Sequence, residues 1–272
     1  MIRAAESKWF KRVWYLYVRY YLLWRHFSIL RLKGKIDPPT MITSGDGGRQ
    51  RPVIYIANHS NWWDGLLAFD AYLPRTTYKH FVMMDEKQLR HYRFFTKLGV
   101  FSIDKTKPSA VVESLQYAAE LLRKQYAVWI FPQGDIEHLE KRPIRFFSGV
   151  AYLLQQCPDA VVVPVTMYYS FCHRQRPEAS IWFGDAASQP WQQWERKVTT
   201  AHLRDLLQTQ LDEHRNFYMD GVLGGPEEQA EHAEQVEQTV HGFETTLRVR
   251  TTDEWFVQFK RWVKSWFMRS RR

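Results

Sequence analysis

Three short apolar runs, each rich in β-branched residues, constrain the fold of this chain most strongly. They are Val53–Ala57 (VIYIA), Ala127–Phe131 (AVWIF) and Ala160–Val165 (AVVVPV), and none of them carries a charge. Continuous apolar runs of this length are typical of strands buried on both faces of a sheet. Segments with helical spacing lie between them, so the order of elements predicts an α/β fold, with a mixed sheet flanked by helices.

Weaker patterns predict the remaining elements of this core. Helices are expected at Leu66–Tyr72, Tyr92–Leu98, Ser109–Gln125, Gly149–Gln156 and Ala201–His214, and further strands at Phe81–Met84 and Ser180–Phe183. Pro108 and Ser109 form a helix start signal. With 272 residues, the chain is long enough to bury a sizeable core.

Positive charge is concentrated at the two ends of the chain. Residues 1–35 hold nine Lys and Arg against Glu6, and residues 248–272 hold eight against Asp253 and Glu254. The net charge of the whole chain is +9, so the middle is acidic. A nucleic-acid-binding protein more often spreads basic charge over its folded core. This distribution disfavours nucleic acid as a partner and points to the surface of a membrane.

Both basic ends are also crowded with aromatic residues. The spacing predicts an amphipathic helix over Trp9–Leu32, with one broad face formed by Trp9, Phe10, Val13, Trp14, Tyr17, Tyr20, Tyr21, Trp24 and Phe27, and with Lys11, Arg12, Arg19 and Arg25 opposite. A second helix is expected at the C-terminal end, with a stripe of Trp255, Phe256, Phe259, Trp262, Val263, Trp266 and Phe267. Arginines interrupt every apolar window that a membrane-spanning helix would need.

Tryptophan and tyrosine prefer the headgroup level of a bilayer, and basic side chains are attracted to anionic lipids. We therefore expect a peripheral, monotopic protein at the cytoplasmic face of a membrane, with anionic lipids as partners. The alternative is that both helices pack on the core as ordinary amphipathic helices. The predicted organisation is a membrane-associating helix at 1–36, an α/β domain at 37–219, an acidic connector at 220–245 and a basic amphipathic helix at 246–272.

A candidate catalytic pair follows the first apolar run directly. The run leads into NHSNWWDG, which places His59 and Asp64 at a turn from strand to helix. Histidine can remove a proton from a hydroxyl when an acceptor orients its other ring nitrogen. Asp64 is the candidate orienter, provided that His59 lies in the turn before the helix, and Ser60 or Asn61 as N-cap permits this.

Four sequence blocks, in this order, resemble those of the glycerolipid acyltransferase family, which includes bacterial lysophosphatidate acyltransferases. They are the H-x4-D block (His59 and Asp64), a block similar to G-x-x-F-I-D-R (Gly99–Lys105), a block similar to F-P-E-G-T-R (Phe131–Ile136) and a V-P-V strand (Val163–Val165). The resemblance covers about residues 50–170.

The resemblance implies transfer of a fatty acyl group from a thioester to a hydroxyl of a glycerolipid acceptor, such as lysophosphatidate or another lysophospholipid. The donor would be acyl-CoA or acyl carrier protein, and no bound cofactor is implied. In that family the histidine takes the hydroxyl proton and the aspartate orients the imidazole. Backbone N–H groups around Gly134 are candidates to stabilise the oxyanion. The absence of a G-x-S-x-G elbow agrees with direct attack by the alcohol.

The departures from the family pattern concern the acceptor. Lys105 replaces the usual arginine, which keeps a charge for a phosphate but loses the bidentate fork. Gln133, Asp135 and Ile136 replace glutamate, threonine and arginine. Gly99, Lys105, Gln133, Gly134 and Asp135 are thus the candidate acceptor residues, and Arg142 and Arg145 are further candidates for a phosphate.

Two alternatives stay open at this point. Gln133 and Asp135 are able to hydrogen-bond a neutral headgroup, so a glycolipid or a carotenoid glycoside is the alternative acceptor. The substitutions in the third block also allow a catalytically inactive, lipid-binding relative. The histidines form no tight cluster with ligand spacing, so no metal site is expected.

Overall fold

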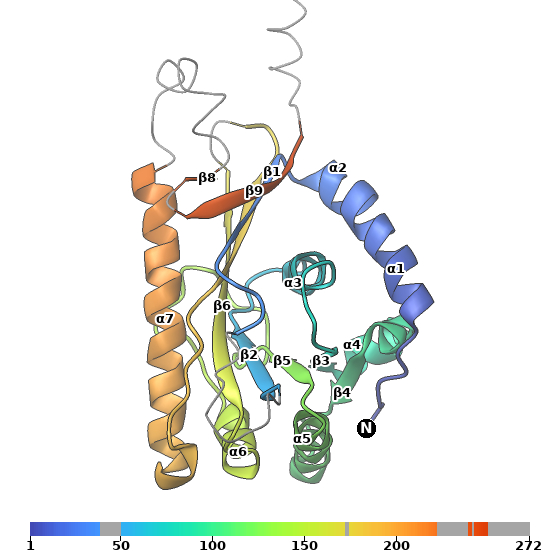
Figure 1. The fold of residues 1–272 in the computed structure, drawn as a ribbon, viewed down its shortest axis with the longest axis vertical. Helices are drawn as coiled ribbons and strands as arrows, with labels where there is room; N and C mark the ends of the chain where they lie inside the picture. Colours follow the sequence, from blue (N-terminus) through green and yellow to red (C-terminus); the bar gives the residue numbers. More distant parts are fainter. Residues whose placement is uncertain (39–49, 172–173, 222–238, 241, 250–272) are drawn as a thin grey trace, which may run out of the picture.

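The computed structural model describes residues 1–38, 50–171, 174–221, 239–240 and 242–249. These residues form a nine-stranded sheet in the order β4-β3-β5-β2-β6-β7-β1-β9-β8 (Figure 1). Neighbouring strands from β4 to β6 are parallel, and β7 is antiparallel to β6. Helices lie on both faces of the sheet. The predicted fold class, a mixed sheet flanked by helices, is confirmed.

The three apolar runs lie side by side in the centre of the sheet. Strand β2 (Val53–Ala57) is hydrogen-bonded to β5 (Ala127–Ile130) on one side and to β6 (Val161–Ser170) on the other. Every residue of β2 and β5 is buried, because helices cover both faces of the sheet here. Strand β6 continues five residues beyond the predicted end at Val165.

The outer strands on the β5 side are β3 (His80–Asp85) and β4 (Val100–Ile103). Helix α4 (Glu86–His91) and the 3-10 helix η2 (Arg93–Leu98) connect them. Neither β4 nor α4 was predicted, because β4 has only four residues and α4 has one apolar residue, Leu89, among its six. On the β6 side, β7 (Glu178–Phe183) follows, and the short helix η3 (Trp191–Gln193) leads into α7.

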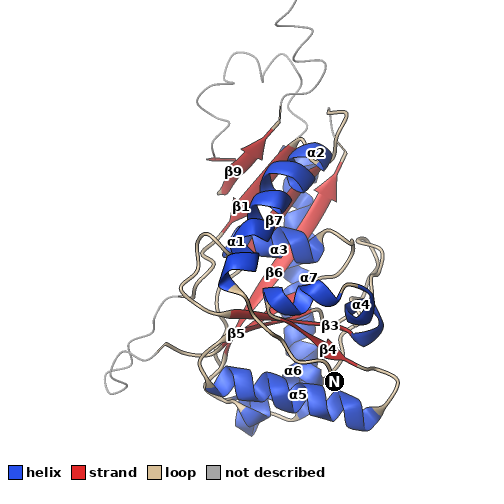
Figure 2. Cartoon of the chain, turned by 90° about the vertical axis from the view of Figure 1, so that its right-hand side faces the viewer, coloured by secondary structure: helices blue, strands red, loops and turns tan. Residues whose placement is uncertain are grey.

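Each face of the sheet has its own apolar core. Helices α5 (Pro108–Arg123), α6 (Gly149–Gln156) and α7 (Arg196–Gly221) cover one face, where Leu203, Leu207 and Leu211 are buried (Figure 2). Helix α3 (Asp64–Tyr72) covers the other face. The N-terminal helical segment lies outside α3, so α3 is enclosed between that segment and the sheet (Figure 1).

The predicted helix at Trp9–Leu32 is wrong in its last part. The helical segment consists of α1 (Lys8–Tyr17), the π-helix η1 (Val18–Leu23) and α2 (Trp24–His26), and Phe27 is extended. Residues Ile29–Lys33 are strand β1, parallel to β7 and antiparallel to β9. The helical spacing of residues 9–26 was extended too far, into a short strand. That strand is stabilised by β7 and β9, which lie far away in the sequence.

The aromatic face of this helical segment is divided between two environments. Phe10 and Trp14 pack against the core of the α3 side, and Phe27 is buried in it, whereas Trp9 and Tyr20 are 71% and 68% exposed. The expected opposite basic face is also divided. Arg12 and Arg25 are exposed, but Lys11 pairs with Glu6, and Arg19 reaches inward to the buried carboxylate of Asp70, 2.8 Å away.

The C-terminal part of the sheet crosses the predicted boundary between residues 245 and 246. Strands β8 (Thr239–Val240) and β9 (Phe243–Arg248) form an antiparallel pair, and β9 joins β1. Thr246–Arg248, placed in the C-terminal helix by the sequence prediction, therefore belong to a strand. The rest of the predicted helix, and residues 222–238 of the acidic connector, lie outside the described residues. In the part of the chain that the structure describes, no helix has the length and apolarity of a membrane span.

Candidate active site

Most of the candidate residues gather at one edge of the sheet because they follow the carboxyl ends of parallel strands. His59 follows β2, Gln133 and Gly134 follow β5, and Lys105 follows β4. Asp85, the last residue of β3, lies at the same edge. The topology alone thus brings three sequence blocks to one place, although His59 and Gln133 are 74 residues apart in the chain.

His59 and Asp64 form the pair that the spacing predicted. His59 lies in the turn before α3, and its Nδ1 is 2.8 Å from Oδ2 of Asp64, the first residue of that helix. The same Oδ2 accepts hydrogen bonds from the backbone N–H groups of Ser60 (2.8 Å) and Asn61 (2.9 Å). These bonds fix the orientation of a fully buried carboxylate. Because Nδ1 donates to Asp64, the Nε2 atom of His59 is left as the proton acceptor.

The backbone of His59 is fixed by the third block. The buried side chain of Gln133 accepts a hydrogen bond from the His59 N–H (2.5 Å), and the His59 carbonyl accepts one from the Glu137 N–H (2.9 Å). The Gln133 amide in turn donates to the Glu137 carboxylate (3.4 Å). Gln133 therefore lies behind His59 and positions its backbone, and its side chain does not line the cavity onto which the His59 ring opens.

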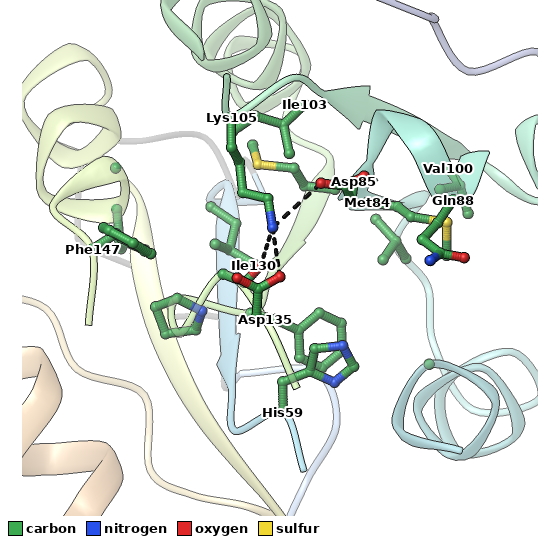
Figure 3. Close-up of a pocket in the computed structure, with 18 of the residues that line it drawn as sticks. His59, Met84, Asp85, Gln88, Val100, Ile103, Lys105, Ile130, Asp135 and Phe147 are labelled. Atoms are coloured by element: carbon green, nitrogen blue, oxygen red, sulfur yellow. Dashed lines mark hydrogen bonds and ion pairs between the residues drawn. The ribbon is translucent and has the colours of Figure 1, made fainter. Parts of the chain in front are cut away.

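The His59 ring opens onto a cavity of about 890 Å³. Its lining is mainly apolar and includes Trp62, Leu66, Phe69, Met84 and Phe95. Figure 3 shows His59, Lys105 and Asp135 directed into this space, with Phe147 on the side opposite Met84 and Asp85. A largely apolar cavity with a few charged groups at a catalytic pair suits an acyl chain attached to a polar reacting group.

Lys105 lies above this cavity and is held by two carboxylates. Its Nζ donates to Asp135 (2.8 Å) and to the Gly134 carbonyl (2.6 Å), and it pairs with Asp85 at 3.3 Å. Partial burial lowers the pKa of Lys105, but the hydrogen bonds and charges of Asp135 and Asp85 outweigh burial and raise it above the usual value. The amine is therefore charged, and its charge is balanced within the protein.

Comparison with known proteins agrees with this geometry. The sequence model of the acyltransferase family matches residues 39–168. Within residues 39–168 the chain therefore matches the acyltransferase family. The 1-acyl-sn-glycerol-3-phosphate acyltransferase of Saccharomyces cerevisiae is 26% identical over 123 residues, which are 43% of this chain and 39% of the yeast protein. The chain thus matches about two fifths of the length of that relative.

The fold of the acyltransferase domain is also found in a solved structure. The 1-acyl-sn-glycerophosphate (LPA) acyltransferase PlsC from Thermotoga maritima superposes with a TM-score of 0.56 at 13% identity, covering 76% of this chain and 80% of that one. At this identity the likeness establishes a common fold. The resemblance inferred from the four sequence blocks is confirmed by the family match.

Two glycines of the acyltransferase domain are required by the backbone. Gly99 has φ of 96°, and a Cβ there would lie 2.7 Å from the His80 carbonyl oxygen. Gly99 ends η2 and starts β4, so it positions the strand that leads to Lys105. Gly134 has φ of 77°, and a Cβ would meet the Phe147 ring at 2.6 Å. Its own N–H donates to the Phe131 carbonyl (3.1 Å), so that N–H is already occupied and is not free for an oxyanion.

The two candidate arginines do not join Lys105. The Arg142 guanidinium pairs with Asp212 of α7 (2.8 Å) and donates to the Leu139 carbonyl, away from the cavity. Arg145 stacks over the Phe147 ring, 4.4 Å from its centroid. Neither arginine lines the cavity, although Arg145 contacts one lining residue, Phe147.

Two residues at this site escaped the sequence prediction. Asp85 was recognisable in principle as a carboxylate that directly follows a predicted strand. Tyr169 of β6 donates its hydroxyl to Oδ1 of Asp64 (2.5 Å), and no local pattern reveals a contact across 105 residues. Among the described residues, no group of three His, Cys, Asp or Glu side chains is arranged to hold a metal ion.

Proposed function

We propose that this chain is an O-acyltransferase that moves a fatty acyl group from a thioester to a hydroxyl of a glycerolipid acceptor. The observation that carries the proposal is the His59–Asp64 pair, with a free Nε2 directed into an apolar cavity of about 890 Å³. Membership of the acyltransferase family and the names of the yeast and Thermotoga relatives support lysophosphatidate or another lysophospholipid as acceptor.

The chemistry follows from the state of the pair. His59 Nε2 takes the proton of the acceptor hydroxyl while its oxygen attacks the thioester carbonyl carbon. The imidazolium that forms is stabilised by Asp64, whose carboxylate is already fixed by two backbone N–H groups. When the tetrahedral intermediate collapses, the carbon–sulfur bond breaks and the thiolate leaves, taking the proton from His59. The products are an ester and a free thiol.

The test is release of free thiol from acyl-CoA and from acyl carrier protein, measured with purified full-length chain and a panel of lysophosphatidate, lysophospholipid and glycolipid acceptors. Thiol release that depends on the acceptor, and that falls at least about 100-fold in His59→Ala, is the expected result. The panel also identifies the donor. Lipid binding without thiol release from any pair would favour the catalytically inactive relative.

One observation favours a second acceptor class. The Lys105 amine, the residue that would meet an acceptor phosphate, is already balanced by Asp85 and Asp135. A neutral, hydroxyl-rich headgroup, as in a glycolipid or carotenoid glycoside, would leave this cluster intact and hydrogen-bond the exposed Asp135 carboxylate. The same acceptor panel separates the two classes by their relative kcat/KM.

We further propose that the chain works on the surface of a membrane. The outer side of α1, η1 and α2 presents a stripe with helical spacing, made of Trp9, Val13, Leu16, Tyr17, Tyr20, Tyr21 and Trp24, all of them exposed. The exposed basic residues Lys8, Arg12 and Arg25 belong to the same segment. An aromatic stripe beside cations matches the headgroup layer of an anionic leaflet.

The membrane proposal is tested by substitution, because deletion of residues 1–35 would also remove strand β1. A Trp9→Ser, Tyr20→Ser, Trp24→Ser variant should lose sedimentation with phosphatidylglycerol vesicles. Phe171→Ser, which removes a 76% exposed aromatic ring from the end of β6, is the matched control and should sediment like the unmodified chain. Equal sedimentation of all three proteins would reject the stripe as the membrane contact.

A further inference from the structure

Tyr169 reaches the catalytic pair from a distant part of the sequence. It lies in β6, on the α3 side of the sheet. Every second residue of this strand packs into the apolar core on that side, namely Val163, Val165, Met167 and Tyr169. Its hydroxyl donates to Oδ1 of Asp64. Neither the sequence blocks nor the family match draws attention to this side chain, because it follows the last matched residue, Tyr168.

The two oxygens of Asp64 have separate sets of donors. Oδ2 receives His59 Nδ1 and the N–H groups of Ser60 and Asn61, whereas Oδ1 receives the Tyr169 hydroxyl. Donors on Oδ2 alone would leave the carboxylate free to swing about that oxygen. A second anchor on Oδ1 fixes the plane of the carboxylate, and thereby the direction in which Oδ2 meets the imidazole.

Tyr169 is itself held in place by aromatic packing. Its ring centroid lies 6.2 Å from that of the buried Phe27, and Phe27 packs edge-on against Trp63 at 5.2 Å. Trp63 directly precedes Asp64, so the tyrosine and the carboxylate are braced by one cluster. Burial, together with the adjacent Asp64 carboxylate, raises the pKa of Tyr169 well above its usual value. The hydroxyl consequently keeps its proton and remains a donor.

We infer that Tyr169 is a positioning residue for acyl transfer: its hydrogen bond to Oδ1 orients the Asp64 carboxylate and tunes the basicity that Asp64 confers on His59. This inference rests on the proposed role of His59 as general base. A hydrogen-bond donor on Oδ1 withdraws negative charge from the carboxylate. Removal of the Tyr169 hydroxyl therefore strengthens the attraction of Asp64 for an imidazolium. The effect is transmitted through Asp64, since the Tyr169 hydroxyl does not line the cavity.

The chain supplies its own matched control. Tyr168, the preceding residue of β6, faces the other side of the sheet, and its hydroxyl donates to Glu140 (3.0 Å). Tyr169→Phe and Tyr168→Phe each remove one hydroxyl from the same strand and leave the ring. Melting temperatures of both variants establish that any difference in His59 is not a loss of fold.

The deciding measurement is the pKa of His59, obtained by NMR titration of the full-length chain carrying isotope-labelled histidine, with His59→Ala used to assign the resonance. In Tyr169→Phe this pKa should rise by about half a unit, while Tyr168→Phe leaves it unchanged. An unchanged His59 pKa in Tyr169→Phe, or equal shifts in the two variants, would overturn the inference. This measurement requires no substrate, so it stays decisive even if no acyl transfer is found.

Kinetics supply the second readout where transfer is observed. Tyr169→Phe should lower kcat about 5- to 10-fold with little change in KM, and the acidic limb of the kcat/KM profile should move to higher pH by the same half unit. Tyr168→Phe should match the unmodified chain in kcat, in KM and in the position of the acidic limb. A change in KM alone would contradict a role in positioning and indicate a contact with substrate.

Discussion

The His59–Asp64 pair and the Lys105–Asp135 pair border the same cavity, and both join a basic side chain to a carboxylate at 2.8 Å, but they are built differently. Asp64 lies five residues from its partner, is fully buried and accepts from backbone N–H groups. Asp135 belongs to a different block from Lys105, and its side chain is 66% exposed. Distance alone therefore does not separate the two pairs.

Burial and backbone anchoring decide what each pair is able to do. A buried carboxylate with four donors holds one geometry, as a general base requires. An exposed carboxylate is exchangeable, because water or a ligand replaces it at little cost. The first pair thus has the preorganisation that the proposed general base requires, and the second is an ion pair that a ligand can rearrange.

Asp64→Asn should have the largest effect, a fall in kcat of about 100- to 1,000-fold, because the amide no longer stabilises the imidazolium. Asp135→Asn makes the same chemical change in the exposed pair and should leave kcat within about twofold. The comparison is made by thiol release under saturating substrates. Similar losses of kcat in both variants would mean that the two pairs form one catalytic unit.

The next largest difference between the two pairs is expected in their contribution to the free energy of unfolding. Asp64→Ala removes the acceptor of the Ser60 and Asn61 N–H groups and should lower the free energy of unfolding by about 2 kcal/mol. Asp135→Ala loses an exposed ion pair and should lower it by less than about 0.5 kcal/mol. Urea unfolding followed by tryptophan fluorescence measures both values. A larger loss in Asp135→Ala would show that the exposed cluster braces the fold.

Lys105→Ala should change the KM for the acceptor. If Lys105 meets a phosphate, the KM for a phosphorylated acceptor rises about 10-fold, and that for a neutral acceptor changes less than about twofold. The pKa of Lys105 is raised in the folded chain, so the amine stays charged throughout the range from about pH 6 to pH 9. The change in KM caused by Lys105→Ala should therefore be the same across this range. An equal change for both acceptors removes Lys105 from the acceptor site.

The smallest effect is expected from freeing Lys105 of one carboxylate. Asp135→Asn should lower the KM for a phosphorylated acceptor about threefold, since the amine then has less competing negative charge. The KM for a neutral glycolipid should stay constant or rise. Steady-state kinetics with one acceptor of each kind measures both. A rise in the KM for the phosphorylated acceptor would show that Asp135 itself contacts the headgroup.

The fold and the catalytic pair were predictable from sequence to an unequal degree. The central strands were recognised because runs such as Val53–Ala57 are apolar without interruption, and α5 and α6 because their spacing is regular. Strand β1 was missed because Arg31 interrupts it, and its charge is matched by the buried Glu178, 147 residues away. A sequence window cannot contain such a partner.

Local sequence patterns were enough to predict the order of the central strands and helices, the α/β class and the His59–Asp64 pair, because each depends on neighbours within a few residues. The tertiary structure alone decided that Tyr169 anchors Asp64, that Asp85 and Asp135 balance Lys105, and that Arg142 turns to Asp212. It also decided which aromatic residues of the N-terminal helix face the core. These contacts join residues far apart in the chain, and only the packing of strands and helices sets their distances.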